Sequence, residues 1–338
     1  MKSTLNRPPN CVRVGIKSAI GIGIVMFAAA AGMASGVATA QTYPSKPVRV
    51  IVGYAPGGGM DAIARIVVAK LSEQLGQQFL VENRPGAAAT LAADFVSKAP
   101  ADGYTIHLAE TGLLIAPTMY PKLSFDPVRS FTPIAGVASL PLAIVVNPSV
   151  PAKNAQELAA WLTSSPGRYS YGSPGVGSLQ HLAMELWKKT IGADVIHVPY
   201  RGAGPMMPDI IGGQIPIGVI SVAPALAQAR SGKLRTIAVT SPARLPQAPD
   251  WPALAESVPK FEAAPRVFLI GPAGLSDAIV TRLADATRNA LSSTDVLDGL
   301  GKQGASAQWV SSRDIAIEMA AESRKWGAIA RDAGVRAE

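Results

Sequence analysis

The stretch RVIVGYAPGGGMDAIARIV, residues 49–67, decides the fold class of this 338-residue chain. Its apolar start, within residues 48–54, is typical of a buried β-strand. From Asp61 to Gly76 apolar residues recur at the spacing of one helix face, and the glycine ends the pattern. The three glycines between these segments permit a tight turn and leave the first amides of the helix unpaired. This order predicts an α/β fold with a binding loop at the carboxyl end of the strand.

Strand and helix patterns alternate along the rest of the chain. Strand patterns occupy residues 78–83, 104–110, 142–148, 168–175, 195–200, 215–221, 233–240 and 265–274, and helical patterns occupy residues 90–99, 155–164, 179–191, 208–213 and 223–231. Beyond residue 274 the pattern is largely helical. We expect two lobes, each a mostly parallel sheet flanked by helices, with a ligand cleft between them. Lobe 1 is assigned residues 41–142 plus 241–338 and lobe 2 residues 143–240, with crossings near Ala143 and Thr240.

Residues 1–40 have the pattern of a cleaved secretory signal peptide. Four basic residues and no acidic one precede an apolar run over residues 19–32, and Ala38-Thr39-Ala40 forms a cleavage site. A membrane anchor is the alternative, but the run is short for a span of about 20 residues. We therefore expect cleavage before Gln41 and export to the periplasm.

The composition argues against several classes of function. Cys11 is the only cysteine and precedes the cleavage site, so no disulfide, thiolate nucleophile or cysteine-bound metal is expected. His107, His181 and His197 form no HxH or HExxH pair, and no metal site is expected. Basic residues are scattered and aromatic residues make up 6% of the chain, unlike a nucleic-acid-binding surface. We expect no cofactor and no nucleic-acid partner.

The glycine loop also matches a dinucleotide fingerprint. Gly57-x-Gly59-x-x-Ala62 satisfies the G-x-G-x-x-A pattern, and Glu82 ends the second strand, where a ribose-binding acid is expected. Pro56 stiffens the turn, however, and Asp61 in the first helical turn would repel a pyrophosphate. A glycine turn that serves only strand–helix packing is a second alternative. The pattern favours binding of a small anion.

Catalytic patterns are weak. No window contains the G-x-S-x-G motif of serine hydrolases; Ser173, within Tyr171–Gly175, comes nearest. No base is recognisable beside Ser173 or Ser178, and no acid–base pair of carboxylates can be identified. We expect a protein that binds without turnover, with an exported hydrolase or a sensory ligand-presenting protein as alternatives.

Several sequence blocks resemble one family of receptors. They are YPSKPVRVIVGYAPGGGMDAIAR, VENRPGAAATLAADFVSKAPADGYT, YPKLSFDPVRSFTPI, GSPGVGSLQHLAMEL, HVPYRGAGPMMPDIIGGQI and GKLRTIAVTSPAR. In this order the blocks resemble the tripartite tricarboxylate transporter substrate-binding proteins, the Bug or TctC family. The resemblance implies a periplasmic, two-lobed Venus-flytrap receptor of type II. Such a receptor, expected as a monomer, binds a small carboxylate between its lobes and delivers it to a membrane permease of two subunits.

The resemblance also implies where the ligand binds. In that family the loop matching Tyr54–Asp61 holds a ligand carboxylate through backbone amides and ordered water, and the block matching Ser173–Gln180 contributes from the other lobe. Both segments begin helices, whose free N–H groups and dipoles favour anions. The candidate ligand-binding residues are Tyr54, Pro56, Gly57, Gly58, Gly59, Met60, Asp61, Thr111, Gly112, Ser173, Gly177, Ser178, Gln180, Arg201, Ser221 and Arg266.

This chain departs from the family pattern at several of these positions. Met60 replaces a common hydroxyl residue, Ile220–Val222 lacks a common Asp-Asn-like pair, and Arg266 replaces a frequent aromatic residue. Arg266 either points inward and binds a carboxylate or points outward into solvent. If Glu110 faces the cleft, it would disfavour a nearby second carboxylate unless a cationic group or Arg266 pairs with it. We therefore expect a less citrate-like ligand: an aromatic or aliphatic mono- or dicarboxylate, or a derivative bearing an amine.

Overall fold

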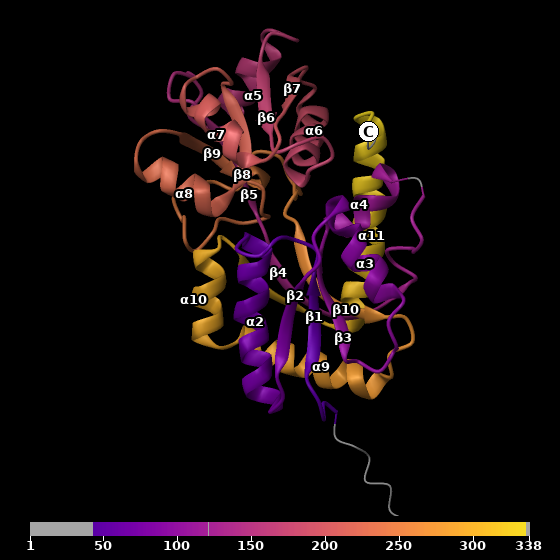
Figure 1. The fold of residues 1–338 in the computed structure, drawn as a ribbon. Helices are drawn as coiled ribbons and strands as arrows, with labels where there is room; N and C mark the ends of the chain where they lie inside the picture. The colour runs from indigo at the N-terminus through magenta and orange to yellow at the C-terminus, as the bar shows by residue number, and fades with distance from the viewer. Residues whose placement is uncertain (1–42, 121, 336–338) are drawn as a thin grey trace, which may run out of the picture. The chain divides into compact units, whose positions relative to one another are not determined.

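A computed structural model describes residues 43–120 and 122–335 of the protein (Figure 1). The predicted signal peptide, residues 1–40, lies outside these ranges. In the described ranges, no helix combines the length and apolar content needed to cross a membrane. The described chain is built around two β-sheets, in agreement with the predicted two-lobed α/β fold.

The first sheet contains six strands in the order β11-β4-β10-β3-β1-β2. Their bounds are β1 Val48–Val52, β2 Phe79–Asn83, β3 Thr105–Glu110, β4 Phe131–Ser139, β10 Arg266–Pro272 and β11 Ser306–Val310. Helices α2 (Gly59–Leu75), α9 (Asp277–Leu291) and α10 (Thr294–Lys302) cover one face. Helices α3 (Thr90–Ser97), α4 (Gly112–Met119) and α11 (Ser312–Asp332) cover the other (Figure 1). Both faces are buried, which explains the continuous apolar run of β1.

The second sheet contains five strands in the order β7-β6-β8-β5-β9. Their bounds are β5 Leu142–Val146, β6 Ser170–Ser173, β7 Ile196–Pro199, β8 Ile217–Ser221 and β9 Arg235–Val239. Apolar side chains of α5 (Ala155–Thr163) and α6 (Leu179–Ile191) pack on one face. Those of α7 (Ala203–Ile211) and α8 (Val222–Arg230) pack on the other.

The sheets are mixed rather than mostly parallel. Strands β1, β2 and β3 pair in parallel, as do β6, β7 and β8. Strand β10 pairs antiparallel with β3 and β4, and β5 pairs antiparallel with β8 and β9. The physical reason is the pair of crossings: a strand that arrives from the other sheet enters against the direction set by the strand–helix–strand units.

The two crossings between the sheets are hydrogen-bonded to each other. The Leu142 N–H donates to Thr240 Oγ1 at 2.9 Å, and the Thr240 N–H donates to the Leu142 carbonyl at 2.9 Å. The Leu140 N–H donates to the Pro265 carbonyl at 2.7 Å. The crossing segments therefore run side by side. The lobe boundaries assigned from the sequence stay a prediction.

Helix α11 contributes to the apolar cores beside both sheets. Its 21 residues correspond to a length of about 30 Å, more than one sheet face needs. Ile315, near its start, packs on the first sheet, whereas Trp326 and Ile329, near its end, join the apolar cluster that contains Trp187 of α6. Residues of the C-terminal segment thus complete the core beside the second sheet.

Some elements were not predicted. Helix α4, GLLIAPTM, is apolar on all sides and contains Pro117, so its sequence has no helical periodicity. Strand β11, SAQWV, lies at the edge of its sheet and is only partly buried, which leaves its strand pattern weak. Strand β4 was also missed, and α7 starts at Ala203 rather than near Pro208.

Candidate functional site

A cavity of about 1030 Å³ is lined by loops that follow strands of both sheets. Residues 54–60 follow β1 and residues 174–180 follow β6, whereas Glu110 and Gly112 lie at and just after the end of β3, and residues 221–224 begin at the last residue of β8. The crossing residues 140–142 and the side chains of Ile115 and Met119 complete much of the wall. The cavity thus lies at the carboxyl ends of the strands, where ligands of α/β sheets bind.

The glycine loop is held from behind by a buried carboxylate. Asp61 accepts hydrogen bonds from the Gly57 N–H at 3.0 Å, Arg65 Nε at 2.9 Å and Asn83 Nδ2 at 2.9 Å. The Arg65 bond, followed by the Gly57 N–H, lowers the pKa of Asp61 to about 2. The Asn83 amide also donates to the Tyr54 carbonyl at 3.0 Å. Asp61 therefore fixes the shape of the loop, and its side chain is 5% exposed.

Four helices begin at the wall of the cavity. Helix α2 begins after Gly58, which supplies no side-chain cap, and α8 begins after Ser221, also without one. Helix α6 begins after Ser178, and α4 begins at Gly112. The first N–H groups of a helix have no partner within it, and its dipole is positive at this end. Lining residues at these starts can thus bind an anion without a basic side chain.

The loop before α6 rests on a stack of aromatic rings. His181 and His197 stack with centroids 3.8 Å apart, and Tyr171 stacks on His197 at 4.9 Å. His181 Nδ1 accepts the Gly177 N–H at 3.0 Å, and the Ser178 hydroxyl accepts the His181 N–H at 3.2 Å. Burial lowers the pKa of both imidazoles to about 4. The neutral stack thereby positions the loop that faces the cavity.

Ser173 has the neighbouring base that sequence reasoning did not find. Its hydroxyl lies 2.7 Å from His197 Nε2 and donates to the Gly175 carbonyl at 3.1 Å. The sequence could not show this pairing because β6 and β7 are brought into parallel register only by the sheet. Ser173 is fully buried and does not line the cavity. The pair therefore supports the loop and is not presented to a ligand.

Glu110 gives the cavity its single charged side chain among the described residues that line it. One of its carboxyl oxygens accepts a hydrogen bond from the Tyr54 hydroxyl. Burial raises the pKa of Glu110, while Tyr54 and the Gly112 backbone oppose that rise. From the sequence, the orientation of Glu110 stayed open, and it was not among the candidate ligand-binding residues.

The predicted site residues divide into two groups. Those that line the cavity are Tyr54, Pro56, Gly57, Gly58, Gly59, Met60, Gly112, Gly177, Ser178, Gln180 and Ser221; Asp61, Thr111, Ser173, Arg201 and Arg266 are not among its lining residues. The Thr111 hydroxyl accepts the Arg266 N–H at 2.7 Å. The Arg266 guanidinium donates to Glu262 at 2.8 Å and to Gln308, and it is 17% exposed. Arg266 thus points neither into the cavity nor freely into solvent, but into a partly buried ion pair.

Other residues that line the cavity were not predicted from the sequence. Gln303 and Gly304 follow α10, and Met119 lies at the end of α4. No local pattern marks them, because only the packing of α4 and α10 brings them to the cavity.

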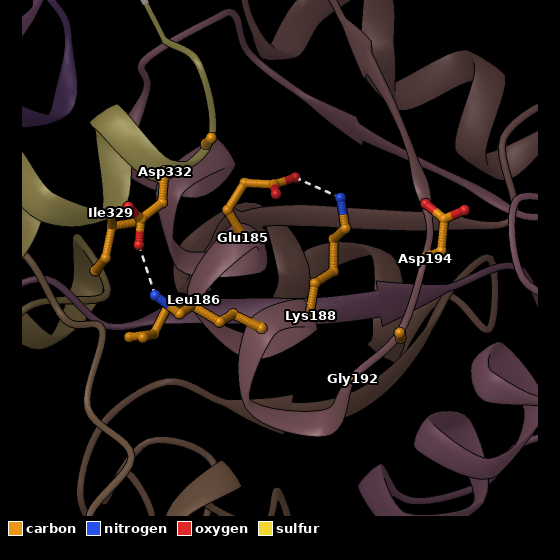
Figure 2. Close-up of a pocket in the computed structure, with 10 residues that line it drawn as sticks. Glu185, Leu186, Lys188, Gly192, Asp194, Ile329 and Asp332 are labelled. Carbon is orange, nitrogen blue, oxygen red and sulfur yellow. Dashed lines mark hydrogen bonds and ion pairs between the residues drawn. The ribbon is translucent and has the colours of Figure 1, made fainter.

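A second pocket, of about 590 Å³, lies between α6 and the end of α11 (Figure 2). Two ion pairs line it: Lys188 Nζ lies 2.7 Å from Glu185 Oε1, and Lys189 Nζ lies 2.5 Å from Asp332 Oδ2. Figure 2 shows both pairs as dashed lines. These pairs join one helix internally and tie α6 to α11, so the pocket is better explained as a helix–helix junction than as a ligand site.

Two sheets joined by paired crossings, with a cavity between their loops, define the class of periplasmic solute-binding proteins, whose solved structures match this fold. Residues 63–335 match the tripartite tricarboxylate transporter family receptor, and the chain belongs to this family. The resemblance found in the sequence is thereby confirmed.

Relatives and solved structures support the assignment. The chain is 31% identical to protein BugT of Bordetella pertussis over 316 residues, which is 93% of this chain and 97% of BugT. An R. palustris protein solved with adipate is 32% identical, has a TM-score of 0.74, and matches over 87% of this chain and 99% of its own. MatC from Rhodopseudomonas palustris, solved with bound malate, is 28% identical, has a TM-score of 0.69, and matches over 85% and 99%.

Proposed function

We propose that the chain is a periplasmic receptor that binds a small carboxylate between its two lobes. It delivers this ligand to a membrane permease of one large and one small subunit, and it acts as a monomer. Family membership and the adipate and malate bound by two similar proteins support this proposal. The observation that carries it is a cavity at which four helices begin and which no described lysine, arginine or histidine lines.

The physical basis is anion binding by helix N-termini. A carboxylate beside the starts of α2 and α6 meets unpaired N–H groups and the positive ends of two dipoles. Each helix end contributes about 0.3–1 kcal/mol when exposed and up to about 2 kcal/mol when partly buried. Binding of this kind is moderate in strength, which suits a receptor that must also release its ligand.

The ligand-contacting residues belong to the lining set. We assign the carboxylate to the amides of residues 59–60 and 179–180, with the apolar side chains of Met60 and Ile115 against the carbon chain. Asp61 and Ser173 act by holding these loops, whereas Thr111 joins the end of β3 to the start of β10. Arg201 and Arg266 are outside the lining set, and we assign them no ligand contact.

Gly59 offers a direct test. It is the first residue of α2, and an added Cβ there would meet nothing within 4 Å. Proline is tolerated at the first helical position, and Gly58, with φ −79° and ψ 168°, already has the extended backbone that a following proline requires. Gly59→Pro removes one amide from the anion site, whereas Gly59→Ala keeps it.

Calorimetric titration of the purified protein with adipate, malate, citrate and benzoate measures the effect. We expect at least one acid to bind, Gly59→Ala to bind it like the wild type, and Gly59→Pro to bind it about tenfold more weakly, the factor of one charge-assisted hydrogen bond. Equal affinity of the two variants would show that the Gly59 amide does not bind the ligand. Absence of binding by every acid would overturn the proposed function.

A further inference from the structure

Glu110 makes one part of the cavity wall chemically different from the rest. Among the described residues, the lining side chains are apolar or neutral apart from this one carboxyl group. Glu110 is 8% exposed, and none of the basic residues described forms an ion pair with it. One of its oxygens accepts the Tyr54 hydroxyl, so the pair presents an acid toward a cavity that otherwise offers backbone amides.

The Glu110 carboxyl group also blocks one of the four helix starts as a site for a ligand anion. An ideal Cβ built on Gly112, the first residue of α4, would collide with the Glu110 carboxyl group. The carboxyl group therefore occupies the start of α4, the place where a helix N-terminus would otherwise attract a ligand anion. The starts of α2, α6 and α8 remain for the ligand.

We infer that the cavity selects a carboxylate that carries an ammonium group at its other end, with the carboxylate on the helix amides and the ammonium on Glu110. This inference rests on the proposed function and narrows it to ω-amino acids and their relatives. A second carboxylate beside Glu110 would place two like charges in a site of low dielectric constant. An ammonium group would instead form a charge-assisted hydrogen bond to a buried acid that lacks a cationic partner among the described residues.

The raised pKa of Glu110 shows that its carboxylate form lacks sufficient stabilising partners, and a bound cation would supply one. Burial disfavours the carboxylate form, and only the Tyr54 hydroxyl and the Gly112 backbone oppose it. A bound ammonium group would favour ionisation. The rival interpretation is a neutral Glu110 that donates its proton to a ligand carboxylate, and it predicts the opposite preference.

A matched series of ligands separates these interpretations. The probes are dicarboxylates of about three to eight carbons, the ω-amino acids of equal length and the unsubstituted monocarboxylates, titrated into the purified protein by calorimetry. At the best length, we expect the ω-amino acid to bind about tenfold more tightly than the dicarboxylate, the factor of one charge-assisted hydrogen bond.

Two variants test whether Glu110 causes the preference for the ω-amino acid. Glu110→Gln keeps an acceptor for the Tyr54 hydroxyl but loses the charge, and we expect it to lose the tenfold preference. Gly112→Ala retains the acid but displaces its carboxyl group, so it should weaken the same preference. The matched control is Glu73→Gln, which makes the same change of charge on an α2 side chain that is 68% exposed and outside the cavity; it should retain the preference.

The possible results separate the ammonium inference from the receptor function. Equal or tighter binding of the dicarboxylate by the wild type would overturn the ammonium inference and leave the proposed receptor function in place. A dicarboxylate preference that grows as the pH falls, and that no longer depends on pH in Glu110→Gln, would show a neutral, donating Glu110. Retention of the amine preference in both Glu110→Gln and Gly112→Ala would also overturn the inference. Failure of all three classes of acid to bind would count against the receptor function itself.

Discussion

Acidification should destabilise the protein through His181, because only the neutral imidazole can accept the Gly177 N–H. Burial, and then the stacked His197, lower the pKa of His181 from 6.5 to about 4. Between these values the unfolded chain binds a proton that the folded chain does not. Stability therefore falls as the pH decreases through this window. Glu185, whose Oε1 lies 3.9 Å from His181 Nε2, opposes the shift only in part.

The size of the loss follows from the two pKa values. At pH 4 the unfolded chain is protonated at His181 almost completely, whereas the folded chain is about half protonated. Linkage then gives a loss of about 3 kcal/mol relative to pH 7.5, and about 2.5 kcal/mol at pH 4.5. His181 is 4% exposed, so solvent screens this effect little.

The assay compares urea unfolding of the wild type and His181→Asn at pH 7.5 and pH 4.5. Asparagine offers an acceptor for the Gly177 N–H but does not titrate, while His107, His197 and the carboxylates are common to both proteins. We expect the wild type to lose about 2.5 kcal/mol more than the variant over this interval. An equal loss in both proteins would refute the assignment of the titration to His181.

Three further variants probe the site and its support. Asp61→Ala should reduce the free energy of unfolding by about 2 kcal/mol and weaken carboxylate binding, because the Gly57 N–H loses its acceptor. Unchanged affinity would show that carboxylate binding does not depend on this loop geometry. Arg266→Ala should leave the carboxylate affinity within about twofold of the wild-type value, because the guanidinium pairs with Glu262 outside the cavity lining. A tenfold loss of affinity in calorimetry would show that Arg266 contributes to ligand binding. Trp326→Ala should cost about 4 kcal/mol in urea unfolding, because the side chain is fully buried, and a cost below about 1 kcal/mol would contradict this packing.

Local patterns were sufficient for most elements around the cavity. The predicted helix over residues 179–191 has the bounds of α6, and the predicted strand over residues 104–110 differs from β3 by one residue. The glycine loop after β1 was predicted in its place, because a strand, a turn and a helix start are set by neighbouring residues. Edge strand β11 and helix α4 lacked such a periodic pattern, and they were missed.

The amino-acid sequence by itself determined the two-lobed α/β class, the family and the helix starts that can bind an anion. It could also name Glu110 and Arg266 as unusual residues for such a site. Only the tertiary structure decided their roles: Arg266 meets Glu262 and Gln308, whereas Glu110 meets Tyr54 at the cavity. The physical reason is that periodicity and turns depend on residues close in sequence, whereas the partner of a charge depends on which distant elements the sheets bring together.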